Sequence, residues 1–170
     1  MMFSIIIPEY QQLKYLDKVL EAWKAQTFKD FELIITADED DLAVKEWCQL
    51  KQVRLTYQTE NTKNYAKVVN AGVYLAGGDY LFICNADSYP EPDCLEHLAK
   101  AADPNKLVST IRINVDEEGK IVGPDWRLER IILEHDLDVV DIFNPNPWQY
   151  MTGNGVLIPA KVFEDTGGLS

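Results

Sequence analysis

The segment Asp79–Ser88, DYLFICNADS, indicates the fold class and contains the first candidate functional residue, Asp87. Residues 79–84 form a short apolar run without alternating polar side chains, which predicts a strand buried on both faces of a sheet. Pro90 and Pro92 follow shortly afterwards and prevent regular structure from continuing at once. Asp87 is therefore expected in a loop at the carboxyl end of a buried strand.

Three earlier apolar runs repeat this pattern. Phe3–Ile7, Phe31–Ala37 and Val53–Tyr57 are predicted to be buried strands. A predicted helix follows each run. Residues 13–23 and 65–76 have apolar side chains at helical spacing, and residues 38–47 begin with acids that can cap a helix. Successive strand–helix units require right-handed crossovers, so we predict an α/β fold: a mostly parallel, Rossmann-like sheet with helices on both faces, in a single domain.

The last third of the chain departs from this pattern. The elements expected there are a hairpin of residues 111–115 and 120–122 with its turn at 117–119, a short helix at 127–133, an irregular loop at 144–147, a strand at 155–158 and a helix opening at 161–165.

Composition limits the possible partners and compartments. The chain has 170 residues, of which 46% are hydrophobic, enough for one sizeable core. Its net charge of -12, without clustered Lys or Arg, argues against nucleic acid as a partner. Three cysteines without CxxC spacing indicate neither a disulfide framework nor a zinc site. No apolar run reaches bilayer length, so we expect no transmembrane segment and a cytoplasmic protein, with a peripheral position at the inner face of a membrane as the alternative.

Acidic residues follow several of the predicted strands. Because the carboxyl ends of parallel strands meet at one edge of a sheet, Pro8–Tyr10, Asp38 and Asp87 are expected to line one cleft. A carboxylate at Asp87 could hold Mn²⁺ or Mg²⁺, whose other ligands would be water and the phosphate oxygens of a nucleoside diphosphate. Alternatively, Asp87 only starts a turn or caps the helix that contains Leu95 and Leu98.

Asp38 also has two interpretations. Its carboxylate could accept a hydrogen bond from the N–H of a nucleobase, or it could cap a helix or lie in a solvated turn. A helix cap or a solvated turn is the preferred interpretation for residues 39–41, the other acids of the same run. Pro8–Tyr10 could frame the base between a rigid backbone and an aromatic ring, although Tyr10 could equally belong to ordinary loop packing.

Several segments match the motifs of a known family in order. Ser4–Tyr10, SIIIPEY, resembles the opening strand of family 2 glycosyltransferases, a hydrophobic run followed by P-x-Y-N. The other matching segments are Gln26–Thr27 with Phe31–Ile35 for "QT...ELIIVDDGS", Asn70–Gly72 with Ala76–Tyr80 for "N-x-G...A-x-G-D-Y", Asn85–Asp87 with Pro90 for D-x-D, and Gly153 with Phe163 and Gly167–Leu169 for "G...vf...GGF". The resemblance covers almost the whole chain.

This resemblance implies a GT-A fold and an inverting glycosyltransferase that takes a sugar from a nucleotide-diphosphate sugar, with a UDP-sugar as the default donor and Mn²⁺ or Mg²⁺ as cofactor. It implies a nucleotide-binding part at 1–106 and the start of an acceptor-binding part at 107–170, for a glycan, lipid or protein acceptor. The implied site residues are Pro8 and Glu9 at the nucleoside, Asp38 at the base, Asn64 near the nucleotide, Asn85 at the ribose or a water, and Asp87 on the metal.

The chain departs from the family pattern at two functional positions. Asn85 replaces the first aspartate of D-x-D and contributes no charge to a cation. The general base of inverting members usually follows the "GGF" stretch, and this sequence stops at Ser170. Either the chain is truncated, or an internal acid such as Asp125 or Asp141 serves as base, so the catalytic residue is left unassigned.

Other functions remain to be weighed against this one. Without a base, the chain could be a non-catalytic nucleotide-sugar-binding domain. A nucleotidyltransferase usually has a Gly-rich, basic loop after its first strand, and residues 9–12, EYQQ, do not resemble one. A phospho-receiver domain is disfavoured because the acids here follow the second and fourth predicted strands instead of the first and third.

Overall fold

A computed structural model describes residues 1–58, 64–110, 112–116, 118–124 and 154–170. The chain divides into two compact units, one made of Met1–Ser109 and Gly153–Ser170, and the other of Thr110–Thr152. The larger unit contains every strand end at which a site residue was expected. In the described part of the chain, no helix is both long and apolar enough to cross a bilayer.

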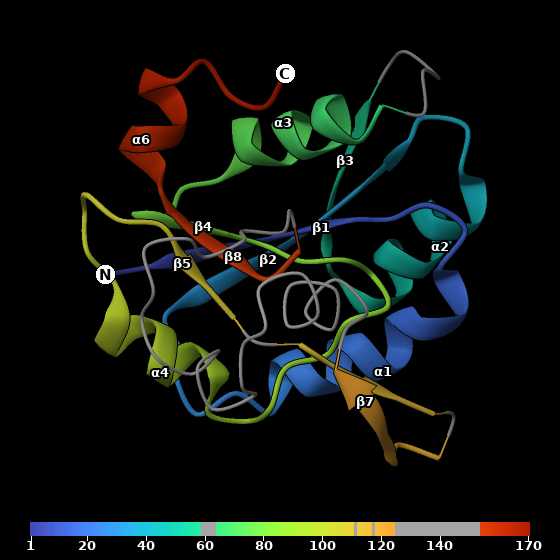
Figure 1. The fold of residues 1–170 in the computed structure, drawn as a ribbon. Helices are drawn as coiled ribbons and strands as arrows, with labels where there is room; N and C mark the ends of the chain where they lie inside the picture. Colours follow the sequence, from blue (N-terminus) through green and yellow to red (C-terminus); the bar gives the residue numbers. More distant parts are fainter. Residues whose placement is uncertain (59–63, 111, 117, 125–153) are drawn as a thin grey trace, which may run out of the picture. The chain divides into compact units, whose positions relative to one another are not determined.

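The larger unit is built on a six-stranded sheet with the order β3-β2-β1-β4-β8-β5 (Figure 1). Its strands are β1 Phe3–Pro8, β2 Phe31–Asp38, β3 Arg54–Gln58, β4 Tyr80–Ile83, β5 Val108–Ser109 and β8 Val156–Pro159. The first four pair in parallel, whereas β8 is antiparallel to both β4 and β5. This order confirms the expected mostly parallel sheet.

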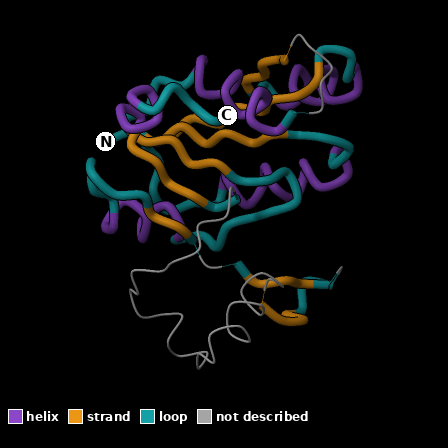
Figure 2. Tube along the Cα trace, turned by 45° about the horizontal axis from the view of Figure 1, so that its top comes forward, coloured by secondary structure: helices purple, strands orange, loops and turns teal. Residues whose placement is uncertain are grey.

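Helices cover both faces of this sheet, as Figure 2 shows. They are α1 Leu13–Lys24, α2 Leu42–Lys51, α3 Tyr65–Leu75, α4 Cys94–Ala101 and α6 Ala160–Asp165. Buried residues of α1, α2 and α4 pack with Ile5 and Ile7 in one core, and those of α3 and α6 pack with Ile6 in the other. Successive β1 side chains thus enter opposite cores, which is why the strand is continuously apolar.

Helix α3 lies unusually close to the sheet. A Cβ atom added at Gly72 would be 2.6 Å from Ile6 Cγ2 and 2.6 Å from Thr36 Cγ2, well inside van der Waals contact. Only glycine allows this approach, because its missing side chain leaves room for methyl groups from β1 and β2. The position of α3 over the sheet, and of the residues at its first turn, therefore depends on Gly72.

The fully buried Gln26 connects the end of α1 to the segment that follows β4. Its Nε2 donates to the Glu91 carbonyl at 2.7 Å, and its Oε1 accepts the Leu95 N–H at 3.0 Å. Next to it, the Thr27 N–H donates to the Pro92 carbonyl at 2.8 Å. The Gln-Thr pair therefore fixes the course of the chain between β4 and α4.

The described part of the smaller unit is the expected hairpin. Strands β6 Ile113–Val115 and β7 Ile121–Pro124 pair antiparallel. Their turn is closed by the Lys120 N–H, which donates to the Asp116 carboxylate at 2.8 Å, and Gly119 has a φ of 84°. The short helix expected at 127–133, the loop at 144–147, and both candidate bases, Asp125 and Asp141, lie outside the described residues. The division into nucleotide-binding and acceptor-binding parts stays a prediction.

Candidate functional site

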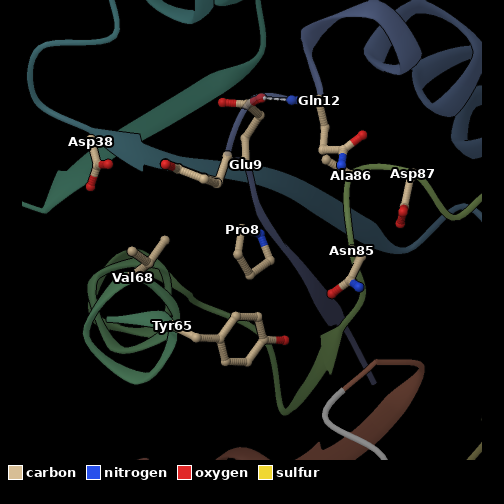
Figure 3. Close-up of a pocket in the computed structure, with 10 residues that line it drawn as sticks. Pro8, Glu9, Gln12, Asp38, Tyr65, Val68, Asn85, Ala86 and Asp87 are labelled. Carbon is tan, nitrogen blue, oxygen red and sulfur yellow. Dashed lines mark hydrogen bonds between the residues drawn. The ribbon is translucent and has the colours of Figure 1, made fainter. Parts of the chain in front are cut away.

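The carboxyl ends of β1, β2 and β4 border a pocket of about 290 Å³ in the larger unit (Figure 3). Strand order reverses between β1 and β4, and ligands of open α/β sheets bind at such a switch point. The pocket is lined by Pro8, Glu9, Tyr10, Gln12, Asp38, Tyr65, Val68, Asn85, Ala86 and Asp87. The structure therefore brings together every site residue expected from sequence except Asn64.

Glu9 follows β1 and is nearly buried, with 3% of its surface exposed. Its Oε1 accepts the Gln12 N–H at 2.5 Å, whereas its buried Oε2 has no hydrogen-bond partner among the described residues. Burial raises the pKa of this carboxyl group, and the negative charges of Asp41 and Asp38 raise it further. Glu9 therefore keeps its proton to higher pH than an exposed glutamate does.

The structure assigns different positions to the acids that follow β2. Asp41 is the N-cap of α2, and its carboxylate accepts the Val44 N–H at 3.1 Å. Asp38 ends β2 and lines the pocket, and in the described part of the chain its buried Oδ1 has no hydrogen-bond partner. Helix capping is therefore accounted for by Asp41, while Asp38 offers an unsatisfied acceptor at the pocket.

Asn85, Ala86, Asp87 and Ser88 form a turn directly after β4. The Ser88 N–H donates to the Asn85 carbonyl at 3.1 Å, which closes the turn. The Asp87 side chain is exposed, and its Oδ1 accepts from the Ser88 hydroxyl at 3.4 Å. Helix α4 has Asp93 as its N-cap, so capping of this helix does not explain Asp87. Asp87 lies within this turn, which starts at Asn85, and the same turn lines the pocket.

Asp87 suits a hard divalent cation. Its carboxylate is exposed at the pocket, and no described Lys or Arg forms an ion pair with it. Among the described residues there is also no group of three His, Cys, Asp or Glu that could hold a metal. A cation here would take one charged ligand from the protein, with Asn85 as a neutral neighbour, and complete its shell with water and phosphate oxygens, as Mg²⁺ commonly does.

Asn64 is not among the pocket-lining residues. It is the N-cap of α3, and its Oδ1 accepts the Lys67 N–H at 3.2 Å. The next residue, Tyr65, does line the pocket, and its ring extends from α3 towards Asn85 in Figure 3. A role for Asn64 near a nucleotide stays a prediction.

Sequence reasoning missed Tyr65, Val68 and Gln12 as pocket residues. Tyr65 and Val68 belong to the segment 65–76, whose helical spacing is the same for core and pocket positions. Gln12 immediately precedes α1, and its buried Oε1 accepts no hydrogen bond from any residue that the structure describes. No local pattern marked it, because its proximity to Asn85–Asp87 is produced by the tertiary fold.

Comparison with known sequences identifies the family. The model of the family described as "Glycosyl transferase family 2" matches residues 4–164. Chondroitin synthase from Escherichia coli is 29% identical over 132 residues, which are 72% of this chain and 19% of that protein. A dolichyl N-acetyl-alpha-D-glucosaminyl phosphate 3-beta-D-2,3-diacetamido-2,3-dideoxy-beta-D-glucuronosyltransferase from Methanococcus voltae is 27% identical over 153 residues, 85% of this chain and 44% of that protein. The chain thus spans less than half the length of these relatives.

Solved structures show the same fold. TarS residues 1–349 from S. aureus, in complex with UDP-GlcNAc, aligns with 98% of this chain and 48% of its own, at a TM-score of 0.65 and 20% identity. The mannosyltransferase PcManGT from Pyrobaculum calidifontis, in complex with GDP-Man and Mn²⁺, aligns with 98% of this chain and 46% of its own, at a TM-score of 0.70 and 20% identity. With the family match over residues 4–164, the chain belongs to glycosyltransferase family 2 and has the GT-A fold.

Proposed function

We propose that this chain binds a nucleotide-diphosphate sugar in the described pocket and transfers the sugar to an acceptor hydroxyl. The observation that carries the proposal is the convergence of Glu9, Asp38 and Asp87 at the switch point between β1 and β4. The family membership supports it, as do the UDP-GlcNAc and GDP-Man found in two structures of the same fold.

In this proposal each side of the pocket has a distinct task. Asp38 accepts a hydrogen bond from the nucleobase through its Oδ1, to which no described residue donates, and Pro8 and Glu9 border the nucleoside. Asp87 holds Mn²⁺ or Mg²⁺ against the diphosphate, and Asn85 contacts the ribose or a water. The cation, when bound, stabilises the charge that develops on the departing diphosphate.

A UDP-sugar is the default donor, as the family resemblance implies, and the Asp38 carboxylate can accept the imide N–H of uracil or an amino group of another base. The acceptor hydroxyl belongs to a glycan, a lipid or a protein, and the transfer is proposed to invert the anomeric centre. We also propose a cytoplasmic location, which fits the three free cysteines of the chain.

A thermal-shift panel of UDP- and GDP-sugars, with and without Mn²⁺, tests the proposal. A ligand at a hundred times its Kd stabilises the folded state by about 2.7 kcal/mol. At about 2–4 °C per kcal/mol for a chain of this size, the melting temperature should rise by roughly 5–10 °C with Mn²⁺ present. Asp87→Asn should abolish the rise.

Asp93→Asn is the matched control, because Asp93 is an exposed acid near Asp87 that contacts His97 instead of the pocket. This variant should keep the metal-dependent rise. No response to any nucleotide sugar, or a response that survives Asp87→Asn, would refute the proposed site. Metal-dependent binding without hydrolysis or transfer of the donor would favour a non-catalytic nucleotide-sugar-binding domain.

A further inference from the structure

Asn154 lies beside the pocket turn without lining the pocket, and only 6% of its surface is exposed. It lies two residues before Val156, where β8 begins to pair with β4. Just after β4, the Cys84 N–H donates to the Ile6 carbonyl of β1 at 3.1 Å. Successive N–H groups of an extended chain point to opposite sides, so the Asn85 N–H faces β8. There the Asn154 Oδ1 accepts it at 2.8 Å. The last backbone hydrogen bond between the two segments runs from the Gly155 N–H to the Ile83 carbonyl at 2.7 Å. The Asn154 side-chain amide thus adds one more hydrogen bond at the end of the β4–β8 pairing.

The other end of the same amide reaches the far side of the turn. Asn154 Nδ2 donates to Ser88 Oγ at 3.0 Å. The Ser88 hydroxyl in turn donates to Asp87 Oδ1 at 3.4 Å. Since the amide N–H occupies a lone pair of the Ser88 oxygen, the hydroxyl hydrogen is left to point at the carboxylate. Asn154, Ser88 and Asp87 therefore form one directional chain of hydrogen bonds.

We infer that Asn154 is a positioning residue for the cation site: it holds both ends of the Asn85–Ser88 turn and, through the Ser88 hydroxyl, orients the Asp87 carboxylate towards the pocket. The inference rests on the proposed function, in which Asp87 binds Mn²⁺ or Mg²⁺. Groups that hydrogen-bond to a metal ligand fix its orientation, and their loss typically lowers metal affinity about 10–100-fold. A cation with a single charged protein ligand should depend strongly on that orientation.

The test is a Mn²⁺ titration of the whole chain, in which electron paramagnetic resonance measures free Mn²⁺ in the presence of UDP or GDP. Asn154→Ala should weaken Mn²⁺ binding about tenfold. Ser88→Ala should weaken it in the same direction, because it breaks the last link to Asp87. Ser88→Thr retains a hydroxyl and should restore binding to near the wild-type value.

Gln26→Ala is the matched control. Gln26 is also a buried amide, and it binds the same chain segment at Glu91 and Leu95, beyond the turn. Its loss should lower the melting temperature without changing the Mn²⁺ dissociation constant. If Asn154→Ala behaves in the same way, or Ser88→Ala binds Mn²⁺ like wild type, the positioning role is wrong and Asn154 is purely structural.

The failure of this inference and that of the proposed function give different results. If wild type binds Mn²⁺ and Asn154→Ala binds it equally well, only the positioning role is overturned. If wild-type protein with UDP or GDP does not bind Mn²⁺, the cation site at Asp87 is refuted and the positioning role with it. Should Asn154→Ala fail to fold, the pair Ser88→Ala and Ser88→Thr still decides the question.

Discussion

Gly72→Ala should destabilise the protein, against the usual preference of helices for alanine. Gly72 lies inside α3, and the new Cβ would be 2.6 Å from methyl carbons of both Ile6 and Thr36. Both side chains are fully buried and β-branched, so they have few alternative rotamers. The clash must therefore be relieved mainly by moving α3 away from the sheet.

Two opposing effects set the size of the change. Overpacking a well-filled core costs typically about 1–3 kcal/mol. Replacing glycine by alanine within a helix returns roughly 1 kcal/mol. The net loss should be about 1 kcal/mol, or a melting temperature about 2–4 °C lower. Because Tyr65 and Val68 of α3 line the pocket, nucleotide binding should weaken as well.

Gly77→Ala provides the comparison. A Cβ at Gly77 would meet its nearest atoms, Glu32 Oε1 and Met2 Cε, at 3.6 Å, which is ordinary contact. This variant should be neutral or up to about 0.5 kcal/mol more stable than wild type. Adding Thr36→Ser to Gly72→Ala removes one of the two clashing methyl groups and should recover part of the loss. Thermal and urea unfolding measure all four proteins, and a Gly72→Ala variant as stable as Gly77→Ala would refute the close approach of α3.

Three further predictions concern Glu9, Gln11 and the three cysteines. The raised pKa of Glu9 means that its contribution to the free energy of unfolding is complete below its ordinary pKa of 4.5 and is lost as the pH rises through the higher folded value. Glu9→Gln should remove this decline. If the free energies of unfolding of wild type and Glu9→Gln, measured with urea, changed in parallel from about pH 4 to 8, the prediction would be contradicted. Gln11 has a φ of 56°, a left-handed conformation that asparagine tolerates better, so Gln11→Asn should add roughly 0.5 kcal/mol; a lower melting temperature would contradict this. Burial raises the pKa of Cys48 to about 12 and of Cys94 to about 11, and it also raises that of Cys84. Iodoacetamide should therefore label the native thiols slowly and the less buried Cys94 first, and rapid labelling of Cys84 in a mass-spectrometric time course would contradict this.

The main elements of the sheet could be predicted because their signal is local. A continuous apolar run such as Phe3–Ile7 identifies a strand buried on both faces, and the order of such runs predicts parallel pairing. Strand β5 was not predicted, since it has two residues and pairs with β8 from much later in the chain. Local periodicity contains no information about such a pairing.

The candidate site was predictable at the strand ends and less so between them. Asp38 and Asp87 could be placed because a strand end fixes where its next residues lie. Within the run of acids at 38–41, the sequence separated Asp38 from the residues that follow it, but it could not tell whether Asp40 or Asp41 is the helix cap, because both side chains are able to cap. Asn154 gave no signal, since its contacts with Asn85 and Ser88 depend on β8 lying beside β4.

The bond between Asn85 and Asn154 joins residues 69 positions apart in the sequence. During synthesis, strands β1 to β4 leave the ribosome well before the residue that completes the turn after β4. Contacts between such distant residues are slow to form because a long loop must first close. The proposed cation site should therefore be among the last features to mature, and a nascent chain arrested before residue 154 should lack it even if its first four strands have already paired.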